Sequence, residues 1–378
     1  MKQHILICGD FCPQDRVNIV LNNSLGGQLL EDWLILLSKM DYSIVNLECP
    51  VVKDNVIKSI EKVGPCLHTT ELSIKLLCEV GFNMVTLANN HFFDCGQKGV
   101  KNTLELLEKY GLDYVGGGEN RKQAEGILYK EIQNKRFAFV NFCENEFSIA
   151  NSVHGGSNPI SLVDNYYQIQ EANRNSDYVI VIVHGGHEGF QLPNPAMVKN
   201  YRFFVDAGAN AVINHHQHCF SGYEIYKDTP IFYGLGNFCF DRKNVRNNIW
   251  NEGYAVELCF DGNDLSFILH PYIQCDEKPG VFFLKGQTGF MEKLTFLNKI
   301  IEDEDKLNLA FENYVKKELA NVRSIFQPYQ NRYLRGAFKR KLLFDCWNIK
   351  HYRNMMNKFT CEAHRELFIR GLELLTHK

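Results

Sequence analysis

The stretch FNMVTLANNH, residues 82–91, runs through a short apolar segment and ends in two amides and an imidazole. An apolar run of this length predicts a buried β-strand. Polar side chains at the end of such a strand either cap the next element or hold a ligand. Asn90 and His91 therefore raise the question of a functional site directly after this strand.

The same rhythm of apolar run, polar turn and helical stretch repeats through the first two-thirds of the chain. Helices are predicted over residues 69–80 and 99–111, the second ending at the C-cap Gly111. Strands that alternate with helices in this way predict an α/β protein whose sheet is covered on both faces. Further strands are predicted over residues 4–10, 42–48, 136–142, 177–186, 210–218 and 230–238.

Five of the predicted strands end in Asp, Glu, Asn or His. In open α/β sheets, ligands bind beyond the carboxyl ends of the strands. We therefore expect these polar side chains to meet in one site at a sheet edge.

The composition is that of an ordinary soluble globular protein, with 45% hydrophobic and 22% charged residues in 378. A formal net charge of −3 gives no global attraction to nucleic acid, so no nucleic-acid partner is expected. We see neither a signal peptide nor an apolar run long enough for a bilayer, and we expect a cytoplasmic location. The 13 scattered cysteines lack a CxxC pair, which argues against a disulfide framework or a structural zinc site.

The character of the sequence changes after about residue 275. Residues 291–322 predict one or two amphipathic helices, and basic residues interleaved with aromatics follow over 323–358. We expect one domain over 1–275 and a helical, basic C-terminal segment over 285–378. A solvated helix face or a cover for the main domain is the favoured interpretation of this segment. The alternative is peripheral docking on a membrane surface or an anionic polymer.

The side chains at the predicted strand ends include the oxygen and nitrogen ligands that divalent cations bind without thiolates. Two neighbouring metal ions need a shared carboxylate and several terminal ligands. Each residue taken alone has an ordinary alternative, such as a helix cap for Asp10 or an Asx-turn for Asn90. Taken together they favour a metal site; the candidates are Asp10, Glu48, Asn90, His91, His184, His216 and His218. His4, His68, His154 and His215 are interpreted as structural.

Several segments, in this order, resemble the bacterial capsule-synthesis CapA family. This family, also called the poly-gamma-glutamate capsule biosynthesis family, belongs to the calcineurin-like metallophosphoesterase superfamily. The resemblance covers roughly residues 4–241 and implies a four-layer α/β/β/α sandwich. The matching segments are CGD, DYSIVNLECPV, GFNMVTLANNHFFDCGQKGVKNTLELLEKYGLDYVGGG, VIVHGGHEGFQLP, DAGANAVINHHQH and GYEIYKDTPIFYGLGNFCFD.

The resemblance also implies roles for individual residues. Glu48 matches the carboxylate that bridges two metals, and His91 matches the general acid that protonates the leaving group. The implied ligands of one or two divalent ions (Mn, Fe or Zn) are Asp10, Glu48, Asn90, His184, His216 and His218. Residues implied to orient ligands or substrate are Asn46, Asn89, Glu188 and Asn237.

The chain departs from the family pattern at four positions. Asn214 replaces a glycine before the paired histidines, Gln217 replaces a proline between them, and Gly185 replaces a tryptophan. Cys12 stands where the first superfamily motif has a histidine. Binding of one metal is therefore expected more firmly than binding of two.

The implied function is metal-dependent hydrolysis, with a phosphoester or polymer precursor as substrate, in capsule or surface-polymer synthesis. Capsule-synthesis proteins are the implied partners. A non-catalytic binding protein on the same scaffold is the alternative, and its role would not need His91. A third interpretation is an assembly factor that oligomerises through the basic C-terminal segment.

Overall fold

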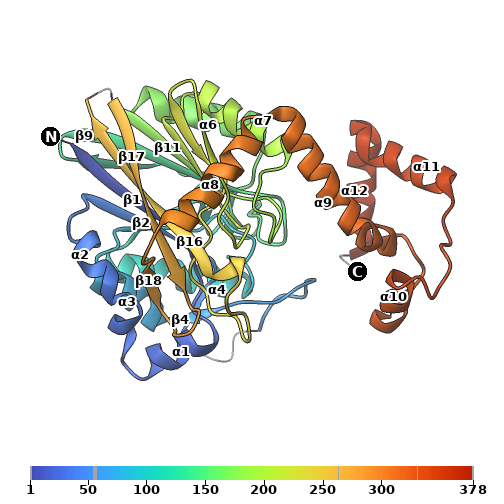
Figure 1. Cartoon of the computed structure of the whole chain (residues 1–378), viewed down its shortest axis with the longest axis horizontal. Helices are drawn as coiled ribbons and strands as arrows, with labels where there is room; N and C mark the ends of the chain where they lie inside the picture. Colours follow the sequence, from blue (N-terminus) through green and yellow to red (C-terminus); the bar gives the residue numbers. More distant parts are fainter. Residues whose placement is uncertain (1, 54–57, 263, 330, 377–378) are drawn as a thin grey trace. The chain divides into compact units, whose positions relative to one another are not determined.

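The computed structural model describes residues 2–53, 58–262, 264–329 and 331–376 (Figure 1). The chain divides into two compact units, Met1–Asn308 and Leu309–Lys378. The described strands all lie in the first unit, and the described part of the second is helical. Whether 1–275 and 285–378 fold as separate domains stays a prediction.

The larger sheet of the first unit has eight strands in the order β18-β17-β16-β1-β2-β5-β6, with β15 pairing β1. Its segment β1-β2-β5-β6 is parallel, whereas β16, β17 and β18 add on in antiparallel fashion. The strands are β1 (Gln3–Phe11), β2 (Tyr42–Leu47), β5 (Met84–Thr86), β6 (Asp113–Val115), β15 (Asn237–Cys239), β16 (Glu252–Asp261), β17 (Asp264–Gln274) and β18 (Val281–Phe283).

The smaller sheet has six strands in the order β13-β14-β12-β11-β9-β8. Every residue of β11 is buried, as expected for a central strand covered on both faces. The strands are β8 (Leu128–Ile132), β9 (Lys135–Cys143), β11 (Tyr178–His184), β12 (Ala211–His215), β13 (Tyr223–Tyr226) and β14 (Thr229–Phe232). Short two-residue strands occur at β3 (Val51–Val52), β4 (Thr69–Thr70), β7 (Gly117–Gly118) and β10 (Gly156–Ser157).

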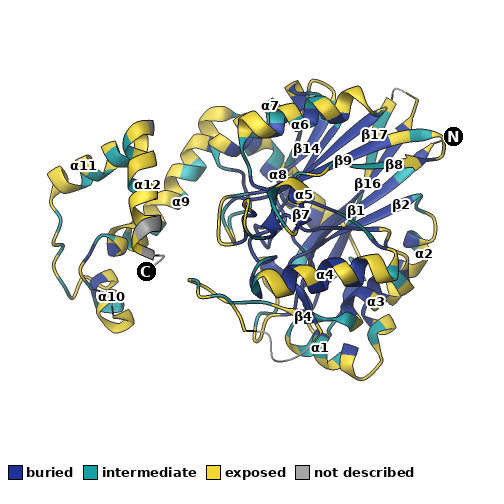
Figure 2. Ribbon diagram, turned by 180° about the vertical axis from the view of Figure 1, so that it is seen from behind, coloured by how far each residue is buried: buried dark blue, intermediate teal, exposed yellow. Residues whose placement is uncertain are grey.

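The two sheets pack face to face, and helices cover their outer faces. Aromatic rings fill the space between the sheets, with ring centroids 5.5 Å apart for Tyr42 and Phe139 and 5.1 Å apart for Phe137 and Phe260. Helices α3 (Glu71–Val80) and α4 (Gly96–Tyr110) lie over the eight-stranded sheet, and α6 (Leu162–Arg174) and α7 (Pro195–Asp206) over the six-stranded sheet (Figure 2). The predicted four-layer α/β/β/α sandwich is confirmed. Smaller helices are α1 (Asp15–Asn22), α2 (Leu34–Leu37) and α5 (Arg121–Ala124).

One predicted strand is wrong in an informative way. Residues 230–238 form two strands in different sheets, because the chain leaves β14, turns through Gly236 at φ +81°, and pairs as β15 with β1. A β-carbon on Gly9 would lie 1.9 Å from the carbonyl oxygen of Gly236. Only glycine therefore allows β1 and this crossing segment to approach so closely.

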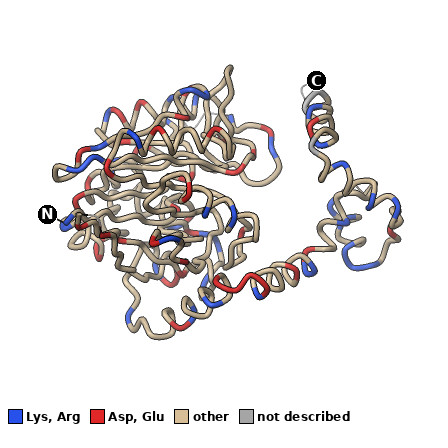
Figure 3. The backbone as a smooth tube through the Cα atoms, turned by 90° about the horizontal axis from the view of Figure 1, so that it is seen from above, with Lys and Arg blue, Asp and Glu red and all other residues tan. Residues whose placement is uncertain are grey.

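The C-terminal helices are α8 (Thr288–Ile301), α9 (Glu304–Ile325), α10 (Arg332–Lys339), α11 (Ile349–Thr360) and α12 (Glu362–Thr376). Helix α8 belongs to the first unit, where its Phe290 packs on Phe220 with ring centroids 4.5 Å apart. Basic side chains recur along the second unit (Figure 3). None of the helices in the described part of the chain combines the length and apolar composition needed to span a bilayer.

Candidate metal centre

The predicted ligands come from both sheets rather than from the edge of one. Asp10 lies near the end of β1 and Glu48 follows β2, both in the eight-stranded sheet. His184 ends β11 and His216 follows β12, both in the six-stranded sheet. The carboxyl ends of these parallel strands converge, and the side chains meet in a buried space. We call Asp10, Glu48, Asn90, His184, His216 and His218 the strand-end cluster; all six are buried.

Glu48 stands at the centre of this cluster. Its Oε1 lies 3.5 Å from His218 Nε2 and 3.7 Å from His184 Nε2. Two trios of ligand atoms, Asp10–Glu48–His218 and Glu48–His184–His216, each lie within 4.8 Å of one another. One carboxylate is thus common to two sets of potential ligands, which is the arrangement that two neighbouring cations require.

The other potential ligands also contact one another, and they have too few protons to hydrogen-bond all of their lone pairs. His184 Nε2 lies 3.0 Å from His216 Nδ1 and 3.1 Å from the amide oxygen of Asn90. One ring proton can form a hydrogen bond in only one of these two contacts. The remaining acceptor atom is then left without a donor and presents its lone pair to the cluster. Converging lone pairs of this kind fit a cation.

Burial sets the charge state of the cluster. Desolvation raises the pKa of Asp10 to about 7 and raises that of Glu48 well above its usual value. It lowers the pKa of both His216 and His218 to about 3, so these imidazoles are neutral, the form that binds metals. Neither oxygen of Glu48 accepts a hydrogen bond from the described residues. Two buried carboxylates surrounded by neutral imidazoles lack positive charge, and the residues therefore fit one or two divalent ions.

The loop that carries the paired histidines is strained and firmly held. His216 and His218 have φ of +89° and +55°, in the region that favours glycine. Asn214 Nδ2 donates to the carbonyls of Gly185 and Tyr233, both at 2.9 Å. Gln217 Nε2 donates to the carbonyls of Leu192 and Phe190, at 2.9 and 3.0 Å. The side-chain amides of Asn214 and Gln217 thus hold this loop in place.

Three asparagines orient the cluster. Asn46 Nδ2 donates to Asp10 Oδ1 at 2.7 Å and lies 3.4 Å from His184 Nδ1. The amide of Asn237 donates to the carbonyls of His218 and Trp250, so its oxygen is the acceptor of the His218 Nδ1–H at 2.9 Å. This bond leaves His218 Nε2 to face Glu48. Asn89 Nδ2 donates to the Leu47 carbonyl at 2.9 Å, and its oxygen accepts the backbone N–H of His91 at 3.1 Å.

His91 is held by a buried ion pair. Its Nδ1 lies 2.7 Å from Asp94 Oδ2, and Lys62 forms an ion pair with the other oxygen of Asp94. Lys62 Nζ is also 3.2 Å from His91 Nδ1. The contact with Asp94 is the shorter of the two and favours a proton on Nδ1, which the carboxylate accepts. His91 Nε2 is then the nitrogen available to a substrate.

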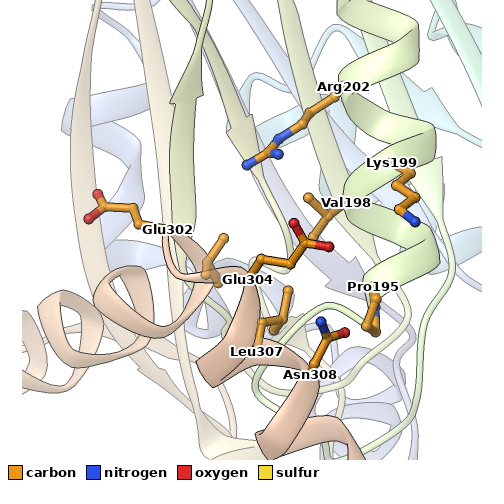
Figure 4. A pocket seen from close by; sticks show the side chains of 9 residues that line it. Pro195, Val198, Lys199, Arg202, Glu302, Glu304, Leu307 and Asn308 are labelled. Carbon is orange, nitrogen blue, oxygen red and sulfur yellow. The ribbon is translucent and has the colours of Figure 1, made fainter.

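A cavity of about 590 Å³ opens over His91, Asn90 and His218. Glu188, which is exposed, lines this cavity rather than joining the buried ligands. Arg242 also lines it, with its guanidinium 5.1 Å from the centre of the Trp250 ring. A smaller hollow of about 200 Å³ lies between α7 and the α8–α9 corner and is lined by none of the predicted site residues (Figure 4).

Sequence reasoning missed three residues near the site. Asp94 is absent from the predicted site residues, although its spacing of three residues from His91 is a readable signal. Lys62 lies in a long loop with no periodicity, so nothing local indicates its position. His215 was interpreted as structural, yet its Nδ1 lies 3.5 Å from Asp10 Oδ1.

The first unit is thus a four-layer α/β/β/α sandwich whose converging strand ends bring carboxylates, an amide and imidazoles together. The family model described as bacterial capsule synthesis protein PGA_cap matches residues 4–242, and the chain belongs to that family.

Named relatives agree with this assignment. The capsule biosynthesis protein CapA of Bacillus anthracis is 35% identical over 54% of this chain and 52% of its own length. The PGA biosynthesis protein CapA of Bacillus subtilis (strain 168) is 33% identical over 53% of this chain and 54% of its own. The chain thus spans about half the length of the curated relatives it matches.

A solved structure is also similar. The crystal structure of a 5'-nucleotidase from Candida albicans SC5314 aligns with 83% of this chain and 56% of that chain. The sequence identity is 11% and the TM-score 0.39.

Proposed function

We propose that this protein is a metal-dependent hydrolase of the metallophosphoesterase type that acts in capsule or polyglutamate synthesis. The observation that carries the proposal is the position of Glu48, shared between two trios of buried ligand atoms. Within the described part of the chain, no N–H group donates to its oxygens, and its neighbour is the carboxyl of Asp10. A structural carboxylate would be paired, because burying an unpaired one is costly.

The residues that would hold one or two divalent ions (Mn, Fe or Zn) are Asp10, Glu48, Asn90, His184, His216 and His218. Bound there, such an ion supplies an activated water at neutral pH and polarises a phosphoryl oxygen. Asn46 and Asn237 fix the orientation of Asp10 and His218 through hydrogen bonds of 2.7 and 2.9 Å. The ligand geometry is thereby set before a substrate arrives.

His91 is the proposed general acid. It borders the cavity, and its Nδ1–H is held by Asp94, so a proton on Nε2 is directed toward the cavity. This proton would pass to the departing oxygen of the substrate. Asp94 fixes the tautomer and stabilises the protonated ring, and Lys62 in turn neutralises Asp94.

The cavity has charged groups of both signs, and the flat Trp250 ring forms part of its wall. Its charged lining residues are Lys62, Arg242, Asp15, Glu146, Glu188 and Asp241. A phosphoester or an anionic polymer precursor in this cavity would meet Arg242 and the proposed metal ligands Asn90 and His218, which all line it. The proposed partners are other proteins of a capsule-synthesis system.

A second candidate is a non-catalytic binding or assembly protein. The observation that favours it is the second unit, which exposes large apolar side chains beside its basic residues; examples are Leu342 at 72% and Phe344 at 76% exposure. Such a surface suits a protein partner or a membrane surface.

Metal content and phosphoester hydrolysis test the proposal together. We expect the purified full chain to retain Mn, Fe or Zn and to hydrolyse a model phosphodiester or phosphomonoester, and His216→Ala to lose both. A protein that binds metal at the cluster but hydrolyses nothing in a broad phosphoester screen would favour the second candidate. A protein that takes up no metal at the cluster would refute the hydrolase.

A further inference from the structure

A second group of metal-ligating side chains lies at the opposite end of β1. His4 on β1 pairs directly with Cys259 on β16, and Glu257 lies two residues from Cys259 on the same strand. Side chains two residues apart share a face of the sheet, so all three lie on one face. We call His4, Glu257 and Cys259 the His4 cluster.

The three ligand atoms of this cluster are close together. His4 Nδ1 lies 2.7 Å from Glu257 Oε1, and Cys259 Sγ lies 3.6 Å from His4 Nδ1 and 3.7 Å from Glu257 Oε1. All lie within 4.8 Å of one another. An imidazole nitrogen, a carboxylate oxygen and a thiol sulfur therefore form a small triangle.

The three distances are close to those between ligand atoms on one face of a tetrahedral zinc site. With Zn–N and Zn–O bonds near 2.0 Å and Zn–S near 2.3 Å, neighbouring ligand atoms stand about 3.3–3.5 Å apart. The two edges that include sulfur already have nearly this length. Only the edge between His4 and Glu257 must open, by about 0.6 Å, and this is the edge now closed by a hydrogen bond.

We propose that His4, Glu257 and Cys259 form a second metal site, which binds Zn²⁺ separately from the strand-end cluster. The mixed nitrogen, oxygen and sulfur ligands suit zinc rather than magnesium or calcium. The His4 side chain is 33% exposed, which leaves a route for the ion and room for a water as fourth ligand.

His270 is a positioning residue for this site. Its Nε2 lies 2.8 Å from Glu257 Oε2, the oxygen that does not face His4. This bond orients the carboxylate so that Oε1 points at His4 and Cys259. A carboxylate held in this way by a neighbouring imidazole is a typical support for a metal ligand.

Ion pairing alone does not account for the arrangement. Two histidines on one glutamate explain the carboxylate, but they do not require a thiol near both the imidazole and the carboxylate. Cys259 is only 5% exposed, and its position opposite His4 is fixed by strand register. A metal ion would use all three groups at once.

The His4 cluster is independent of the proposed hydrolase site. His4 and Asp10 are six residues apart on one extended strand, which places them about 20 Å apart. Loss of zinc here would therefore leave the strand-end cluster intact, and the reverse also holds.

The test uses the full chain with the strand-end cluster disabled by Glu48→Gln and His216→Ala. This double variant is loaded with Zn²⁺, desalted and analysed for metal by mass spectrometry. We expect it to retain about one zinc per chain, and to lose it when Cys259→Ser or His4→Ala is added. His270→Gln should weaken zinc affinity by about 10- to 100-fold. Cys346→Ser, which removes an exposed thiol in the second unit, is the matched control and should change nothing.

Cobalt provides a readout that depends on the sulfur ligand. Co²⁺ added to the same double variant should give a thiolate charge-transfer absorption that Cys259→Ser abolishes. The cobalt band is expected in the double variant itself. The measurement therefore stays informative even if the Cys259→Ser variant folds poorly. Absence of zinc and of the cobalt band in the double variant would overturn the proposal. Zinc or a cobalt band that survives Cys259→Ser would overturn it equally.

Discussion

The two ends of strand β1 carry two clusters of metal-ligating side chains that differ in almost every physical respect. At the carboxyl end, Asp10 joins carboxylates, an amide and imidazoles from strand ends of both sheets, beneath a cavity. At the amino end, His4 joins a carboxylate and a thiol from one neighbouring strand, on a face partly open to solvent.

The two ends of the strand suit different kinds of site. Strand ends converge from several elements and leave room above them, so they can hold an ion and a substrate together. Paired positions within a sheet are held by continuous backbone hydrogen bonds, which favours a fixed site without a substrate cavity. We therefore assign chemistry to the carboxyl end and zinc binding to the amino end.

Glu48→Gln should have the largest effect, because it removes the carboxylate shared by both trios of ligands. We expect metal content at the strand-end cluster to fall and phosphoester hydrolysis to drop by about 10³-fold or more. Steady-state kinetics and metal analysis on the same preparation measure this. Glu105→Gln, an exposed glutamate on α4, is the control, and an equal loss in that variant would point to general damage.

His91→Asn separates chemistry from metal binding within the carboxyl-end cluster. Metal content should stay, while kcat falls by about 10²-fold, because the proposed proton donor is gone. Asp94→Asn should lower kcat less, by about 10-fold, since it disturbs only the tautomer and charge of His91. Normal turnover in His91→Asn would contradict its role as general acid.

Cys259→Ser tests the His4 cluster at the amino end of β1. Zinc should no longer be retained at the His4 cluster, because a ligand atom is removed, while phosphoester hydrolysis stays within about twofold of the parent. Isothermal titration with Zn²⁺ and an activity assay are the two measurements. A parallel loss of hydrolysis would mean that the two ends of the strand are coupled.

Arg242→Ala should have the smallest effect. This side chain lines the cavity with its guanidinium 5.1 Å from the centre of the Trp250 ring, so its removal weakens attraction of an anionic substrate without touching the ligands. We expect KM to rise about fivefold with kcat nearly unchanged. The effect should shrink at high salt, and a salt-independent fall in kcat would argue against this assignment.

Much of the fold was predictable from local patterns. Alternating apolar runs and helical stretches indicate a layered α/β protein, and Gly111 ends α4 in the left-handed conformation, as expected of a C-cap glycine. The strand over 230–238 was mispredicted, because an apolar run does not reveal that its second half pairs with a strand of the other sheet. That pairing depends on a glycine-to-glycine approach between residues distant in sequence.

By itself the sequence determined which residues stand at strand ends, because apolar runs and the polar residues that follow them are local features. It thereby indicated the members of the strand-end cluster, whose roles stay a prediction. Only the tertiary structure decided that two sheets share this cluster, that Lys62 and Asp94 hold His91, and that His4 faces Cys259. These relations depend on strand register and long-range packing, which fix the distances between segments far apart in the sequence. No local sequence pattern indicates which of these segments will meet.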